Sequence, residues 1–250
     1  MADVNDPPPR NHDHPPRRPP IGFAHRGGRA GLRFGRLRIG PSGEFAENTV
    51  PAFQNALRLG AAAVESDVWL TSDGEPVLRH DGDVGERRVR DLPLAELPPG
   101  TLTLADLYDA CGTDFDLSLD MSDPGALEAV VTAATKSGTA DRIWLVSEWP
   151  IGRDWRAAAG GEVHLVAGVS ARHLGAGFLR LLADVRTAGS CAINMPDWQW
   201  NRARARATHA AGLLGFGWRA NTPWQIRRLA DAGCDGIYSD AVRALIAVTR

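Results

Sequence analysis

An alternation of short apolar runs with longer helix-prone stretches, repeated eight times after residue 20, leaves few folds open to this chain. The runs are apolar at nearly successive positions and are bounded by Gly, Asp or Pro, as expected for strands buried on both faces. Eight such units in about 230 residues predict a single-domain (β/α)8 TIM barrel of the α/β class. The expected strands are Ile21–His25, Ala63–Leu70, Phe115–Met121, Arg142–Ser147, Glu162–Val169, Ser190–Met195, Leu213–Trp218 and Gly236–Ser239.

Helix-prone stretches separate these runs. Val50–Leu59, for example, has Pro51 in its first turn and is followed by Gly60, which are typical start and stop signals. An open doubly wound sheet is the alternative fold, but it favours a GxGxxG turn after the first strand, and this chain reads HRGG there. The other expected helices are Thr103–Ala110, Pro124–Lys136, Trp155–Ala159, Ala176–Thr187, Trp198–Ala211, Pro223–Ala232 and Ala241–Thr249.

Composition excludes several classes of protein. The 28 basic and 30 acidic side chains give a net charge of -2, which argues against a nucleic-acid partner bound by bulk electrostatics. No apolar run approaches the ~18–20 residues of a transmembrane segment. Residues 1–20 are rich in proline and lack an apolar core, so we expect a disordered tail and not a secretory signal. Three cysteines without a CxxC spacing are typical of a reducing compartment, and we expect a cytoplasmic protein.

Acidic residues gather where two neighbouring strands are expected to end. Glu65 and Asp67 are two residues apart on one strand, so their side chains leave the same face. Asp120 ends the next strand along the chain. Because the strand ends of a barrel share one mouth, we expect three carboxylates together there, and their mutual repulsion is relieved by a cation. Oxygen ligands predict a hard divalent ion, and both Ca²⁺ and Mg²⁺ remain open.

Two histidines and an arginine are expected at the same mouth. His25 ends the first strand, and a turn at 71–74 leads into a returning strand, Pro76–His80, which brings His80 back. Two imidazoles that titrate near neutrality can act as a base and an acid in one substitution. Arg26 offers the planar fork that suits a phosphate. A cation, an arginine and two histidines at one face indicate phosphoryl-ester chemistry.

The sequence resembles the glycerophosphodiester phosphodiesterases over residues 21 to about 240. The resemblance is carried by AHRGG (24–28), by ENTVPAFQNALRLGAAAVESDVWLTSDGEPVLRHD (47–81) and by GWRANTPWQIRRLADAGCDGIYSD (217–240). That family folds as a (β/α)8 barrel, in agreement with the strand pattern. The resemblance therefore implies one domain over 21–250.

The resemblance also implies residue roles. His25 and His80 are the expected catalytic pair, and Arg26 is expected to contact the phosphate. Glu65 and Asp67 are expected to bind the cation, with Asp120 standing where the family usually has Glu.

Two further residues have two interpretations each. Glu47 either supports the site or is an acid favoured at a helix start. Trp218 is either a wall of the substrate pocket or a core residue.

This chain departs from the family at two places. Ser122 stands where the family has Lys, and the only lysine, Lys136, lies within the following expected helix. Arg219 is a candidate to supply the missing charge at the substrate. The second departure is a Gly- and Arg-rich stretch at 28–46, which either forms a lid that carries phosphate-binding arginines or is a solvated insertion.

The expected activity is metal-dependent hydrolysis of a glycerophosphodiester to glycerol 3-phosphate and an alcohol. A lipid-derived phosphodiester, cleaved in the manner of a lysophospholipase D, is one alternative. A non-catalytic phosphodiester-binding barrel is the other, suggested by Ser122 in place of lysine. The sequence does not fix the headgroup preference or the oligomeric state.

Overall fold

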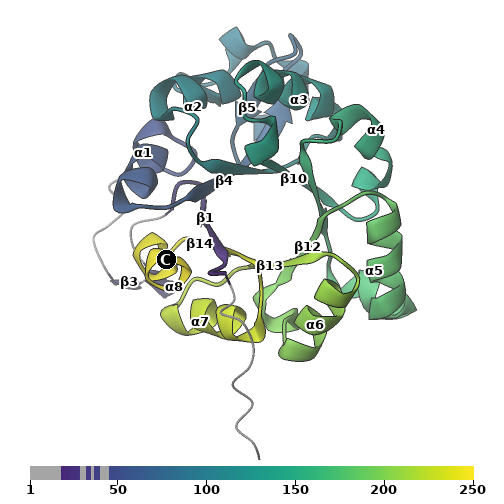
Figure 1. Ribbon diagram of the computed structural model, residues 1–250. Helices are drawn as coiled ribbons and strands as arrows, with labels where there is room; N and C mark the ends of the chain where they lie inside the picture. The colour runs from purple at the N-terminus through teal and green to yellow at the C-terminus, as the bar shows by residue number, and fades with distance from the viewer. Residues whose placement is uncertain (1–17, 29–31, 35–36, 40–44) are drawn as a thin grey trace, which may run out of the picture.

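Eight parallel strands close into a barrel with helices around it, as the sequence predicts (Figure 1). The computed structural model describes residues 18–28, 32–34, 37–39 and 45–250. Each barrel strand pairs with its neighbours along the chain, and β1 pairs with both β4 and β14 to close the ring. The barrel strands are β1 (Ile21–His25), β4 (Ala63–Leu70), β9 (Asp116–Asp120), β10 (Ile143–Glu148), β11 (His164–Gly168), β12 (Ala192–Pro196), β13 (Leu214–Trp218) and β14 (Gly236–Ser239).

Aromatic side chains fill the interior of the barrel. Phe23 stacks on Tyr238 with 4.6 Å between ring centroids, and Trp144 and Phe216 pack against them. The Tyr238 hydroxyl lies 3.0 Å from the hydroxyl of Ser118 on β9. These four aromatic side chains form a plug inside the barrel, and the open part of the barrel lies at the carboxyl ends of the strands.

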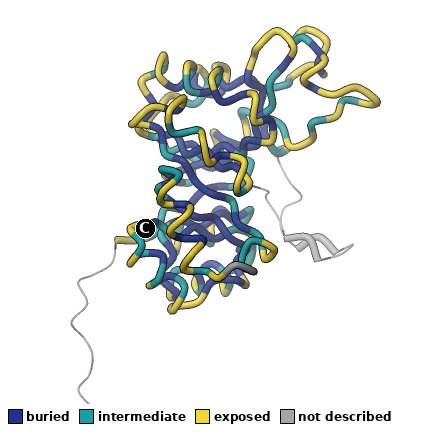
Figure 2. Tube along the Cα trace, turned by 90° about the vertical axis from the view of Figure 1, so that its right-hand side faces the viewer, coloured by how far each residue is buried: buried dark blue, intermediate teal, exposed yellow. Residues whose placement is uncertain are grey.

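The helices cover the outside of the barrel (Figure 1). The positions that face the barrel are buried, whereas exposed positions lie at the periphery (Figure 2), and the buried helix residues are largely apolar. Thr103 caps α2 through a reciprocal pair of bonds with Asp106, and Thr222 caps α7 in the same way with Gln225. The helices are α1 (Val50–Leu59), α2 (Leu104–Cys111), α3 (Leu127–Lys136), α4 (Arg156–Ala159), α5 (Phe178–Thr187), α6 (Arg202–Ala210), α7 (Pro223–Ala232) and α8 (Val242–Thr249).

Helix α6 begins four residues later than the sequence pattern predicts. Trp200 is buried, and its indole N–H donates to the carbonyl oxygen of Phe216 at 2.8 Å. That bond holds the chain against β13 before the helix begins. The side chain of Asn201 then accepts a hydrogen bond from Arg204 and caps the helix. The predicted stretch Trp198–Ala211 therefore divides into a short 3-10 turn and a helix.

The strand expected to return towards the barrel mouth is present. β5 (Pro76–Leu78) pairs antiparallel with the end of β4 and also with β8 (Leu102–Thr103). The segment between them includes a two-stranded ribbon, β6 (Asp83–Val84) and β7 (Arg87–Arg88). Apolar side chains of this segment pack on β5 as a small separate core, formed by Val77, Val89, Leu92 and Leu97.

The expected tail and the Gly- and Arg-rich stretch at 28–46 lie mostly outside the described residues. Residues 1–17 of the tail are not described, and neither are Arg29 and Arg36 of the 28–46 stretch. Within that stretch the backbone forms an antiparallel ribbon, β2 (Leu32–Phe34) and β3 (Leu37–Ile39). The proposed lid stays a prediction. Among the described helices, none has the length and apolar character that a membrane crossing requires.

Candidate functional site

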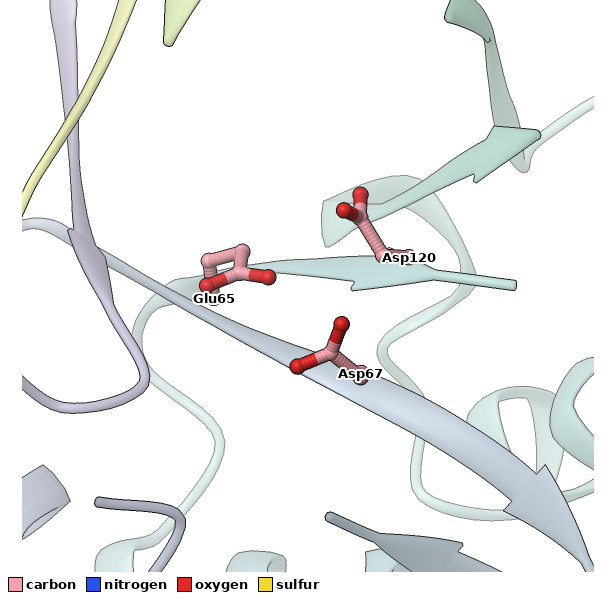
Figure 3. Close-up of side chains that lie close together, drawn as sticks. All are labelled: Glu65, Asp67 and Asp120. Atoms are coloured by element: carbon pink, nitrogen blue, oxygen red, sulfur yellow. The ribbon is translucent and has the colours of Figure 1, made fainter. Parts of the chain in front are cut away.

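Three carboxylates converge at the mouth of the barrel, as the sequence predicts (Figure 3). Glu65 and Asp67 alternate with an outward residue on β4, and Asp120 ends β9 directly beside Asp67 in the strand register. One oxygen from each of the three carboxylates lies within 4.8 Å of the others. Glu65 and Asp67 are buried, and Asp120 is partly buried. Strand alternation and adjacency are sufficient to produce this cluster.

The electrostatics of the cluster favour a cation. Burial raises the pKa of Glu65 to about 8, although the charge of His25 opposes the change. Burial, followed by repulsion from Asp67, raises the pKa of Asp120 to about 7. Oδ2 of Asp67 is buried and accepts no hydrogen bond, and it forms an ion pair with the Arg26 guanidinium at 3.2 Å. The three carboxylates lie close together and repel one another when ionised. Such a set of oxygen ligands suits a hard divalent ion such as Mg²⁺ or Ca²⁺.

Arg26 ties three acids together from the turn after β1. Its backbone N–H donates to Oε2 of Glu65 at 3.0 Å. Its guanidinium lies 3.2 Å from Oδ2 of Asp67 and 3.4 Å from Oε1 of Glu47. Arg26 also lines the main pocket described below. Glu47 therefore contacts the site through Arg26, and its supporting role stays a prediction.

His25 is held by two residues that follow later barrel strands. Its Nδ1 lies 2.6 Å from Oδ1 of Asp240, and Oδ2 of Asp240 accepts a 2.9 Å bond from the side-chain amide of Asn221. Nε2 of His25 faces Oε2 of Glu65 at 3.8 Å. Burial lowers the pKa of His25, but the negative charges of Glu65 and Asp240 outweigh that effect and raise the pKa to about 9.

Asp240 and Asn221 are absent from the site residues predicted above. Both are polar residues that follow directly on a predicted strand, in the sequences WRAN (218–221) and YSD (238–240). That position at a strand end was the sequence signal that could have identified them. Their connection to His25 needs the closure of β14 onto β1, which brings together residues 215 positions apart.

His80 lies in a second, neighbouring cavity. This cavity has a volume of about 300 Å³ and is also lined by Glu47 and Asn48. The imidazole is half exposed, and its Nδ1 lies 2.8 Å from Oδ1 of Asp81. Burial raises the pKa of Asp67, while the charges of Arg26, His80 and His25 lower it, so both histidines act electrostatically on this carboxylate.

The main pocket has a volume of about 440 Å³ and two different ends. His25, Arg26, Glu65 and Asp120 form one end. The opposite walls are formed by residues of the later strands and their following loops, namely Val146, Gly168, Val169, Asn194, Trp218 and Arg219.

Trp218 and Arg219 both line the pocket, and their role in substrate binding stays a prediction. The Arg219 guanidinium carbon lies 5.7 Å from the ring of Trp218 and 5.4 Å from that of Trp198. Two aromatic faces thus hold this cation at the rim. Ser122, at the position where the resemblance implies a lysine, also lines the pocket. Lys136 is exposed near the end of α3.

Backbone strain concentrates at this mouth. Among the described residues, the non-glycine positions with positive φ are Arg26 at 53°, Asn48 at 56° and Arg219 at 66°. Arg26 and Arg219 line the main pocket, and Asn48 lines the cavity beside it. Such conformations cost free energy and commonly mark functional sites.

Comparisons with known proteins all find similarity to glycerophosphodiester phosphodiesterases. The model of the glycerophosphoryl diester phosphodiesterase family matches residues 25–107, a segment that holds six of the nine predicted site residues. A Mycobacterium tuberculosis protein named "Probable glycerophosphodiester phosphodiesterase 2" is 29% identical over 89% of this chain and 91% of its own length.

Solved structures share the fold. The glycerophosphodiester phosphodiesterase of Thermotoga maritima has a TM-score of 0.74 at 21% identity, covering 94% of this chain and 99% of the other. An Oleispira antarctica phosphodiesterase, solved with the product sn-glycerol-3-phosphate, has a TM-score of 0.71 at 18% identity, covering 92% of this chain and 96% of the other.

Proposed function

Because the chain belongs to the glycerophosphoryl diester phosphodiesterase family, we propose that it hydrolyses glycerophosphodiesters to glycerol 3-phosphate and an alcohol, with the aid of a divalent cation. The observation that carries the proposal is the convergence of the carboxylates of Glu65, Asp67 and Asp120, because Glu65 and Asp120 line the same pocket as the His25 imidazole. The product-bound Oleispira antarctica phosphodiesterase has the same fold.

The three carboxylates would hold the cation. A bound divalent ion would supply Lewis-acid polarisation of the phosphate, and it would neutralise the repulsion among its ligands. The guanidinium of Arg26, at 3.2 Å, already offsets part of the charge of Asp67.

His25 exchanges a proton with the substrate through Nε2, because Asp240 occupies Nδ1. In the hydrolysis, either a water oxygen attacks phosphorus directly, or the neighbouring glycerol hydroxyl attacks it and water then opens the cyclic ester. In the first displacement the bond from phosphorus to the alcohol oxygen breaks, and that alcohol takes up a proton. One histidine of the pair His25 and His80 removes the proton from the attacking oxygen, and the other protonates the leaving alcohol.

Arg219 supplies the positive charge that Ser122 does not. It lines the same pocket as Ser122, and the rings of Trp198 and Trp218 restrict where its guanidinium can lie. A fixed guanidinium stabilises negative charge on phosphate oxygens more effectively than a mobile one, because less ordering is needed in the transition state. Trp218 forms the adjoining wall.

Release of glycerol 3-phosphate from glycerophosphocholine tests the proposal. We expect turnover by the full chain with MgCl₂ or CaCl₂, its loss in EDTA, and a fall in kcat of about 10²–10⁴ in His25→Ala. His209→Ala is the matched control, since that imidazole pairs with Asp235 beneath the barrel. Turnover of lysophosphatidylcholine alone would favour the lipid alternative, and turnover of neither ester would favour a binding protein.

A further inference from the structure

Asn194 is a buried amide with no hydrogen-bond partner among the described residues. Its side chain lines the main pocket and is 6% exposed. Oδ1 is sealed from solvent and accepts no bond, and the structure gives the amide nitrogen no partner either. Since both ends of the amide are unpaired, the assignment of its oxygen and nitrogen does not affect this conclusion.

The rest of β12 makes this amide unusual. Ile193 and Met195 face outward and are fully buried beneath the helices, while Ala192 packs with the aromatic plug inside the barrel. An apolar residue at 194 would continue the barrel interior without leaving a buried amide unpaired. By contrast, the other asparagine of the pocket, Asn221, has both ends of its amide bonded to Asp240.

The position of Asn194 separates it from the carboxylates. β12 is the fourth strand after β4 in the ring of eight, so Asn194 lies across the barrel mouth from Glu65, which lines the same pocket. Its register neighbour on β11 is Gly168, which also lines the pocket and has no side chain to cover the amide. A ligand whose phosphate lies at the carboxylate end therefore presents its other part to Asn194.

We propose that the Asn194 amide hydrogen-bonds the hydroxyl groups of the substrate's glycerol moiety and thereby selects glycerol esters over deoxy analogues. An amide places an acceptor beside a donor, and two adjacent hydroxyls offer the complementary pair. A site with buried polar groups discriminates strongly against a ligand that leaves them unpaired. The proposal rests on the proposed function and names the part of the substrate that is recognised.

Binding of two phosphate monoesters tests this role without turnover. Glycerol 3-phosphate and n-propyl phosphate differ only in the two hydroxyls. Titration calorimetry on the full chain with MgCl₂ should show glycerol 3-phosphate binding tighter than n-propyl phosphate by about 10-fold or more. In Asn194→Leu this preference should fall below about threefold, chiefly through weaker binding of glycerol 3-phosphate.

Two further variants make the outcome decisive. Val146→Ala enlarges the same pocket without altering a polar group, so it should change both affinities alike. Asn194→Leu should also raise the melting temperature, because it removes an unpaired amide from a buried site. If Asn194→Leu does not fold, Asn194→Ala must lose the same preference.

The proposal is overturned if wild type has no preference, binds neither ester, or keeps its preference in the Asn194 variants. These outcomes are distinguishable from failure of the proposed function. Wild-type turnover of glycerophosphocholine with an unchanged preference in Asn194→Leu would remove only the role of Asn194. An Asn194-dependent preference in a protein that does not hydrolyse glycerophosphocholine would remove only the catalytic proposal.

Discussion

Orientation of the His25 imidazole depends on a chain of two contacts. The side-chain amide of Asn221 donates to Oδ2 of Asp240 at 2.9 Å, and Oδ1 of Asp240 lies 2.6 Å from Nδ1 of His25. This arrangement directs Nε2 into the pocket and favours the tautomer that keeps its hydrogen on Nδ1. Asp240 is thus a positioning residue in the proposed reaction, because it acts through His25.

Asp240→Asn should lower kcat for glycerophosphocholine by on the order of 10², because the imidazole loses the partner that fixes its tautomer and orientation. KM should change little, since Asp240 acts through His25. Steady-state kinetics separate the two constants. Asp235→Asn is the control, because that carboxylate holds His209 instead. A variant whose kcat stays within about twofold of wild type would show that Asp240 does not position His25.

Among single residues, the sequence predicts the contacts that follow from strand alternation. It does not predict the contacts that depend on an unusual backbone conformation. Glu65 and Asp67 share a face because they are two residues apart on a strand. The contact between Arg26 and Glu47 depends on a backbone with φ of 53° at Arg26. No pattern of residue types specifies that conformation for an arginine.

At the scale of elements, the turn after β1 is the most constrained part of the site. Gly27 has φ of 78°, and a Cβ at this position would lie 2.8 Å from the backbone carbon of Ala52 in α1. The glycine therefore lets the turn that carries Arg26 pack directly against helix α1. Gly74 has a similar φ of 88°, but a Cβ there would meet nothing within 4 Å.

Gly27→Ala should destabilise the protein by about 2 kcal/mol more than Gly74→Ala, because only the first adds a steric clash to the unfavourable φ. Urea unfolding gives the two free energies of unfolding, and the Gly74 variant measures the conformational cost alone. Equal losses in the two variants would mean that the contact with α1 carries no strain.

Element boundaries show where sequence patterns fail. Strands β1, β4 and β14 and helices α1 and α7 have the predicted bounds, since glycine, proline and capping signals mark them. Helix α6 differs because a long-range bond from Trp200 to β13 overrides the local signal. A tertiary contact of this kind is not encoded in the residues next to the boundary.

At the scale of the whole molecule, barrel closure assembles the site. β1 and β14 are the first and last barrel strands, and their pairing brings Asp240 to His25. The number of strands and their order follow from the eightfold alternation in the sequence. The position of His80 does not, because it depends on how the segment after β5 packs on its own small core.

The proposed reaction requires that the three carboxylates bind one divalent cation. The pKa of Glu65 is raised to about 8 and that of Asp120 to about 7, so both groups hold protons at pH 6.5 to a larger extent than at pH 8.5. Cation binding must displace those protons. Affinity should therefore rise with pH over this range, by on the order of 10- to 100-fold.

Calorimetric titration of CaCl₂ or MgCl₂ into the metal-free full chain at pH 6.5 and pH 8.5 measures this directly. We predict one site per chain in wild type, tighter binding at pH 8.5, and loss of that site in Asp67→Asn. Asp154→Asn, which removes an exposed acid outside the cluster, should bind as wild type does. Absence of binding in wild type, or undiminished binding in Asp67→Asn, would contradict the account.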